Sequence, residues 1–199
     1  MARVVLTQPG PRVCGLEERL RGLGHEPVAL PLSRVVDLGA EGRVREVAAR
    51  LGGFDWVILV SPAAIAAAAR IPGVHWPPGT GVAVVGPGSL QAVVDSGLPV
   101  EPDRVLMPDG PPFDADALVA TAPLRAPRGL RILVLRGEGG SEGWIARLRA
   151  GGAIVETCEL YRREPVDPPE ASLAALRAML ERGPLPVFVF TQVDSVVRL

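Results

Sequence analysis

The 199-residue sequence contains no lysine, so all of its 21 basic residues are arginine. A nucleotide-binding P-loop needs a lysine that reaches the phosphates, and the sequence therefore excludes that type of site. Alanine, glycine and proline are abundant, which indicates a GC-rich genome as the cause of the arginine bias. The alternative is selection for arginine as a planar binder of anions.

Cysteine and histidine are also scarce, with two residues of each. Cys14 falls in a predicted helix and Cys158 in a predicted strand, where we expect buried thiols. His25 and His75 belong to no cluster with the spacing of metal ligands. We therefore expect neither a metal site nor a Cys–His catalytic pair.

The sequence has no export signal, no membrane-length apolar run and no excess of one charge. Its first ten residues, MARVVLTQPG, lead directly into a strand and lack a hydrophobic signal core. No apolar run approaches the length of a membrane span. The net charge of −1 gives no electrostatic reason to bind nucleic acid. We expect a cytoplasmic protein with neither a membrane nor a nucleic-acid partner.

Short apolar runs alternate with apolar residues at helical spacing, which is typical of an α/β fold with parallel sheets. Strands are predicted at residues 3–6, 28–30, 56–60, 82–85, near 100, 132–135, 154–160 and 187–190. Leu173, Leu176 and Leu180 mark a helix before the last strand. Extended crossings at 31–38 and 161–169 bracket the middle of the chain and suggest two domains. Periodicity alone also allows one continuous sheet.

Two glycine turns, at 86–88 and 137–139, follow predicted strands. A dinucleotide-binding fingerprint would need a third glycine, but Gln91 and Glu142 stand at those positions. Simple strand-to-helix geometry explains both turns. The functional alternative is that their backbone N–H groups bind anions at the carboxyl ends of parallel strands.

Residues 130–165 carry a family resemblance. A strand ending in L-R-G-x-G-G, then a helix, then a strand ending in L-Y-R-R resembles the uroporphyrinogen-III synthase family. The start of the chain is similar to that family as well, with a strand, T-x-P, a helix and a strand ending in P-L. Gln8 stands where most members have arginine. The resemblance extends over nearly the whole chain.

The resemblance implies two doubly wound, flavodoxin-like parallel-sheet lobes joined by two extended crossings. The first lobe would comprise residues 1–32 and 168–199, and the second residues 33–167. The family continues for roughly one more strand–helix repeat after the position of Leu199. We therefore expect the lobe built from the chain ends to be incomplete at its C-terminus.

The resemblance also implies an activity. Members of the family are cofactor-free lyases that cyclise hydroxymethylbilane, a linear tetrapyrrole polycarboxylate, with inversion of the terminal ring and loss of water. The product belongs to haem and porphyrin biosynthesis. We expect a monomer with this small-molecule substrate. The alternative is a two-lobed module that binds small anions without catalysis.

Tyr161 is the only tyrosine and, by the resemblance, the expected catalytic residue. Its phenol can hydrogen-bond to the departing hydroxyl or protonate it. The alternative is a purely structural role, as an amphipathic aromatic residue at a domain edge. Helix N-termini, hydroxyls and an arginine at strand ends are expected to hold the substrate carboxylates. Ser61 and Ser141 are also predicted helix N-caps. The substrate-binding candidates are Thr7, Ser61, Gly86, Gly88, Ser89, Arg136, Gly137, Gly139, Ser141, Thr191 and Gln192.

Overall fold

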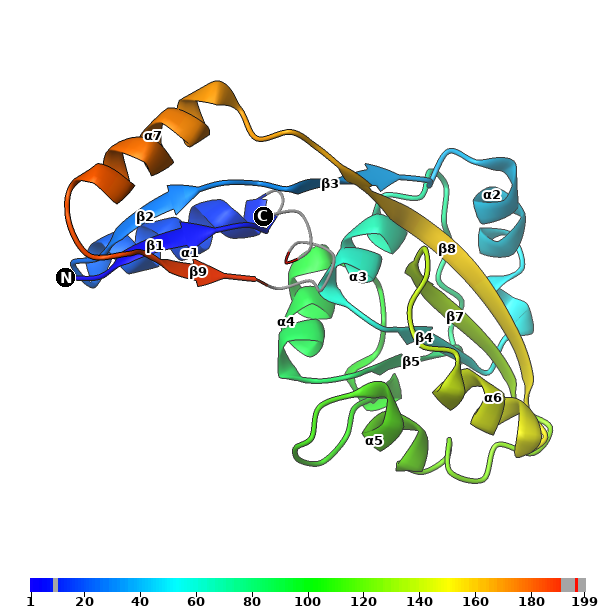
Figure 1. Ribbon diagram of the computed structural model, residues 1–199. Helices are drawn as coiled ribbons and strands as arrows, with labels where there is room; N and C mark the ends of the chain where they lie inside the picture. The colour runs from blue at the N-terminus through cyan, green and yellow to red at the C-terminus, as the bar shows by residue number, and fades with distance from the viewer. Residues whose placement is uncertain (9–10, 191–195, 197–199) are drawn as a thin grey trace. The chain divides into compact units, whose positions relative to one another are not determined.

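The computed structural model describes residues 1–8, 11–190 and 196 (Figure 1), and for residues 11–14 it describes the backbone alone. The chain forms two compact units, one of Met1–Val36 with Arg163–Leu199 and one of Asp37–Arg162. The unit boundary crosses two neighbouring strands, β3 (Ser33–Asp37) and β8 (Ile154–Pro165). These boundaries lie about four or five residues inside those expected from the sequence.

The first unit is a parallel sheet in the order β2-β1-β9, built from both ends of the chain. Val5 packs with Met179 of α7 on one face, whereas Val4 and Leu6 pack with Leu16 of α1 on the other. Each face of the sheet is therefore covered by one helix. The elements are β1 (Arg3–Leu6), α1 (Pro11–Gly22), β2 (Glu26–Ala29), α7 (Glu170–Glu181) and β9 (Val187–Val189).

The second unit contains a larger sheet in the order β3-β8-β7-β4-β5-β6, in which the pairs from β8 to β6 are parallel. Without the two-residue edge strand β6, the order β5-β4-β7-β8 is 2-1-3-4 in chain order, as in flavodoxin-like folds. The strands besides β3 and β8 are β4 (Trp56–Leu59), β5 (Gly81–Val84), β6 (Val105–Leu106) and β7 (Arg131–Gly137). The helices are α2 (Gly42–Ala48), α3 (Pro62–Ala69), α4 (Pro87–Ser96), α5 (Ala115–Ala120) and α6 (Gly143–Ala150), with 3₁₀ turns at Leu51–Gly53 and Pro102–Arg104.

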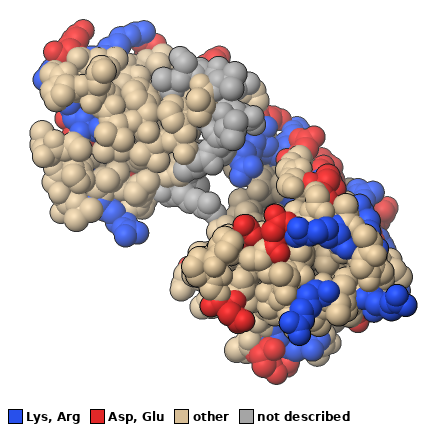
Figure 2. All heavy atoms as spheres, turned by 60° about the horizontal axis from the view of Figure 1, so that its bottom comes forward, with Lys and Arg blue, Asp and Glu red and all other residues tan. Residues whose placement is uncertain are grey.

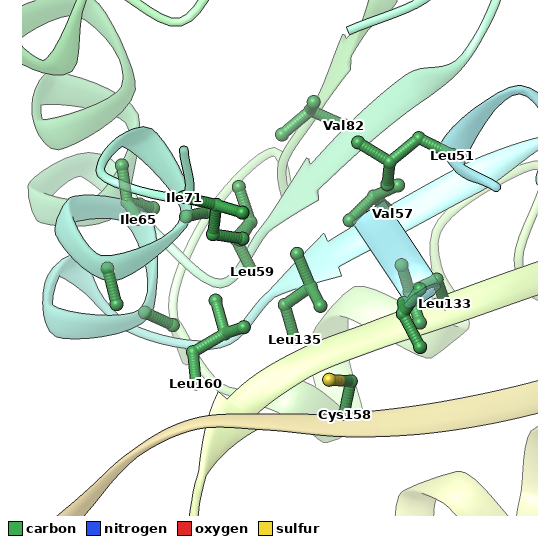
Figure 3. Close-up of a cluster of buried hydrophobic side chains, with 14 of the residues drawn as sticks. Leu51, Val57, Leu59, Ile65, Ile71, Val82, Leu133, Leu135, Cys158 and Leu160 are labelled. Atoms are coloured by element: carbon green, nitrogen blue, oxygen red, sulfur yellow. The ribbon is translucent and has the colours of Figure 1, made fainter. Parts of the chain in front are cut away.

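Helices cover both faces of this sheet. Successive strand residues point to opposite faces, so Val57 and Leu59 pack under α2, α3 and α4, whereas Ile58 packs under α5 and α6. Figure 3 shows the first of these clusters, with Leu133 of β7 and Ile65 of α3 in it. Because both faces are buried, the strands read as continuous apolar runs. The predicted class, α/β with doubly wound parallel sheets, is confirmed.

Some local predictions are wrong. The strand expected near residue 100 lies at Val105–Leu106, because these residues pair with β5. Glu142, and not Ser141, is the N-cap residue of α6. The helix marked by Leu173, Leu176 and Leu180 is present as α7, in which Met179 is fully buried and Leu180 is 42% exposed.

Among the described residues, no helix has both the length and the apolar character that a membrane span requires.

Candidate active site

A cavity of about 310 Å³ lies at the carboxyl ends of β4, β5 and β7. The chain leaves β4 towards β5 and later returns to β7 on the other side of β4, so the order of winding reverses between β4 and β7. Such reversal points are where open α/β sheets bind ligands. Five predicted site residues line the cavity, namely Arg136, Gly137, Gly139, Ser141 and Tyr161.

Tyr161 is positioned by an irregularity in the pairing of β7 with β8. Arg136 lies opposite Glu159, but the next residue, Gly137, lies opposite Tyr161. A Cβ atom on Gly137 would lie 2.5 Å from two ring carbons of Tyr161, so only glycine leaves room for the ring. The tyrosine is 3% exposed. It lies within β8, which continues to Pro165 and so extends beyond the strand end expected at residue 160.

Ser61, which follows β4, is within hydrogen-bond distance of Tyr161. Its Oγ accepts a hydrogen bond of 3.1 Å from the backbone N–H of Ala64 and so caps α3, as predicted. The same oxygen lies 3.2 Å from the Tyr161 hydroxyl, and either atom can donate. A serine hydroxyl has one proton and two acceptor sites, so it can satisfy both partners at once.

Among the described residues that line the cavity, Arg136 is the one with a basic side chain. Its side chain is only 11% exposed and forms ion pairs with Glu142 and, at 3.8 Å, with Glu159. Its Nε has no hydrogen-bond partner among the described residues. Asp114 and Glu138 bring carboxylates to the same lining. The local charge is therefore mixed, and on the face drawn in Figure 2 acidic and basic side chains are interspersed over the second unit.

The loop after β7 turns sharply into α6. Gly139 and Gly140 have φ angles of 76° and 97°, which residues with side chains rarely adopt. Ser141 follows them, exposed at the cavity wall. The glycines after β7 are thus explained by the backbone conformation of this turn, and Gly139 and Gly140 also line the cavity.

The other candidates do not line this cavity. Gly86 is buried beside Phe113, Gly88 has open space around it, and Ser89 is buried in α4. Thr7 belongs to the first unit, where its hydroxyl donates a 2.9 Å hydrogen bond to the carbonyl oxygen of Val189.

Two further candidates, Thr191 and Gln192, lie outside the described residues.

Sequence reasoning missed several lining residues, among them Val60, Val85, Asp114 and Trp144. Asp114 caps α5 through a 2.8 Å hydrogen bond from the N–H of Ala117. The polar residue before a helix is visible in the sequence, and helix starts of parallel α/β units gather at the carboxyl edge of the sheet. This signal could have added Asp114 to the candidates.

Cys158 is buried on β8, and burial raises the pKa of its thiol above the ordinary value of 9.0. A thiol held protonated in this way is a poor nucleophile. Cys14 lies where side chains are not described. In the described part of the chain, no group of three or more His, Cys, Asp or Glu residues is placed to hold a metal ion.

Comparison with known proteins decides the family. A family model described as uroporphyrinogen-III synthase HemD matches residues 15–199. The chain belongs to the uroporphyrinogen-III synthase family. Uroporphyrinogen-III synthase of Salmonella typhimurium is 30% identical over 166 residues, which cover 80% of this chain. The chain spans 64% of the length of that relative.

Solved structures of the same family share the fold. Uroporphyrinogen-III synthetase from Helicobacter pylori matches with a TM-score of 0.61 at 11% identity, covering 99% of this chain and 76% of that chain. A mutant uroporphyrinogen III synthase from Thermus thermophilus matches with a TM-score of 0.56 at 18% identity, covering 91% and 69%. At these identities the likeness concerns the α/β fold alone.

Proposed function

We propose that this member of the uroporphyrinogen-III synthase family cyclises hydroxymethylbilane, with inversion of the terminal ring and loss of one water molecule. Family membership over residues 15–199 is the observation that carries the proposal. The cavity at the reversal point of the sheet supports it, because that edge is where such folds bind ligands, and Tyr161, whose hydroxyl contacts Ser61, lines this cavity.

The proposed reaction needs a proton at the departing group. The terminal hydroxyl leaves as water when it receives a proton, and an azafulvene cation remains. The far ring attacks through its substituted carbon and passes through a spiro intermediate before the inverted macrocycle closes and a ring proton is lost. We assign the first proton to the Tyr161 hydroxyl, with Ser61 holding that hydroxyl in place.

The remaining task is conformational. The open-chain substrate can close unaided to the uninverted isomer, so the protein must hold its two ends in the geometry that favours inversion. Arg136 and the backbone N–H groups of residues 139–141 are the proposed donors to the substrate carboxylates, because the N–H of Glu138 already donates to the carbonyl oxygen of Tyr161. Charge–dipole and charge–charge contacts of this kind suit a polyacid without requiring a strongly basic protein.

The test is product analysis after incubation of hydroxymethylbilane with the complete gene product. We expect the inverted macrocycle, formed faster than spontaneous closure. Formation of only the uninverted isomer at the spontaneous rate would exclude the activity. Tyr161→Phe keeps the ring and removes the hydroxyl, and we expect it to lose turnover while it retains affinity for the product.

The competing proposal is a module that binds small anions without catalysis. The burial of Tyr161 at 3% exposure is the observation that favours it, because a buried ring can serve packing alone. Turnover by the parent protein would dismiss this reading. The monomeric state and the cytoplasmic location remain proposals too, and light scattering of the purified protein tests the first.

A further inference from the structure

Arg136, the proposed binder of a substrate carboxylate, already forms an ion pair with a carboxylate of the protein. Arg136 pairs with Glu142, the N-cap residue of α6, and the arginine side chain is 11% exposed. The carboxylate of Glu142 thus lies where a substrate carboxylate would meet this guanidinium. One arginine cannot hold both carboxylates in the same geometry.

The position of Glu142 allows its carboxylate to be displaced from Arg136. Its side chain is 57% exposed, so its carboxylate regains water when it leaves the guanidinium. Its carboxylate makes no capping hydrogen bond to α6, so the helix start does not depend on it. Glu159, 3.8 Å from the same guanidinium, stays near Arg136 after such a release.

Two other carboxylates lack this relation to Arg136. Glu138 lines the cavity on the exposed loop after β7. Asp114 also lines it, but its carboxylate accepts the capping N–H of Ala117. Both repel an anionic ligand only through their negative charge. Glu142 repels it in the same way and also pairs with the guanidinium that the ligand would bind.

We propose that Glu142 is an internal competitor of the substrate: its carboxylate holds Arg136 in the empty site, is displaced when a substrate carboxylate binds, and thereby lowers affinity. The inference rests on the proposed function, because it takes the ligand to be a polycarboxylate. It makes Glu142 a residue that sets specificity and affinity. It is not a catalytic residue.

The experiment compares Glu142→Gln with Glu138→Gln, which removes the same charge from the cavity lining. Binding of uroporphyrin III, the oxidised macrocycle, is measured by titration calorimetry, so the result does not depend on turnover. We expect Glu142→Gln to tighten binding by about three- to tenfold and Glu138→Gln by less than about twofold. In the background of Arg136→Gln, the gain from Glu142→Gln should disappear.

Equal gains from the two glutamine variants would overturn the inference, because they would reduce the effect to general charge. Weaker binding by Glu142→Gln, or no binding by any variant, would overturn it as well. Thermal unfolding of each variant confirms that the fold is retained. Turnover of hydroxymethylbilane by the parent protein is measured separately, so failure of the proposed activity is distinguishable from failure of this inference.

Discussion

At the scale of single residues, the contact between Gly137 and Tyr161 gives the sharpest requirement in the site. A methyl group on Gly137 would lie 2.5 Å from the tyrosine ring, well inside van der Waals contact. The ring is 3% exposed, and its hydroxyl lies 3.2 Å from the Ser61 Oγ, so a shift of the ring would disturb that contact.

We therefore expect Gly137→Ala to lower the free energy of unfolding by about 1–3 kcal/mol and to abolish most of the proposed activity. The matched control is Gly42→Ala at the start of α2, where nothing lies within 4 Å of the added methyl. Chemical denaturation and the product assay measure both variants. Equal behaviour of the two would contradict the close packing of Tyr161.

Ser61 has two roles that a pair of substitutions separates. Ser61→Ala removes the cap of α3 and the partner of the Tyr161 hydroxyl, and we expect a loss of about 1 kcal/mol in stability with a lower kcat. Ser61→Thr keeps a hydroxyl and a good cap, so it should recover most of both. If Ser61→Ala lowers stability but leaves kcat and its pH profile unchanged, the serine serves only the helix.

Local backbone features at the candidate site could be predicted from the sequence. Gly139 stands at a positive φ angle and Ser61 caps a helix, and both features leave local traces in the sequence. The pairing of Tyr161 with Gly137 left none, because it depends on a register irregularity between two strands. Thr7 looked like a ligand donor, yet its hydroxyl is used by a carbonyl of a strand 182 residues away in the sequence.

At the scale of elements, buried parallel strands were predictable and edge pairing was not. The runs in β4, β5 and β7 are apolar throughout because helices cover both faces of the sheet. Residues 31–38 were expected only as an extended crossing, but they contain β3, which neighbours β8. Local sequence carries little record of a partner strand more than a hundred residues away.

Helix α7 provides a test of which face is inward. Met179 is fully buried against the first sheet, whereas the adjacent Leu180 is 42% exposed. We expect Met179→Ala to destabilise the protein by about 2–4 kcal/mol and Leu180→Ala by less than about 1 kcal/mol. Urea titration followed by circular dichroism measures both. The reverse order would contradict the burial of Met179.

At the scale of the whole molecule, Cys158 links stability to pH. Burial raises the pKa of its thiol above 9.0 in the folded state, so the unfolded chain loses this proton first as pH rises. Above the ordinary thiol pKa the folded state then binds more protons than the unfolded state, and the free energy of unfolding falls with increasing pH. The contribution is fully present below that pKa.

We therefore expect stability to decline from about pH 9 upward, and Cys158→Ala to show a shallower decline over the same range. Denaturant midpoints measured across that range in a Cys14→Ser background test this link. A parallel pH dependence of the two proteins would show that the buried thiol contributes nothing to it. A thiol reagent should likewise modify Cys158 only as fast as the protein unfolds.

The central strand of the first unit, β1, pairs with two strands that are synthesised at very different times. Strand β1 is among the first segments to leave the ribosome, and β2 follows soon after to cover one side of it. Its other neighbour, β9, pairs Val187 with Val4 and is translated only after the entire second unit. Nascent β1 must therefore keep one hydrogen-bonding edge vacant while an independent body of chain matures between the two halves of its sheet. Such a molecule benefits from rapid completion of the inserted unit, and slow translation late in the message would prolong the exposure of that edge.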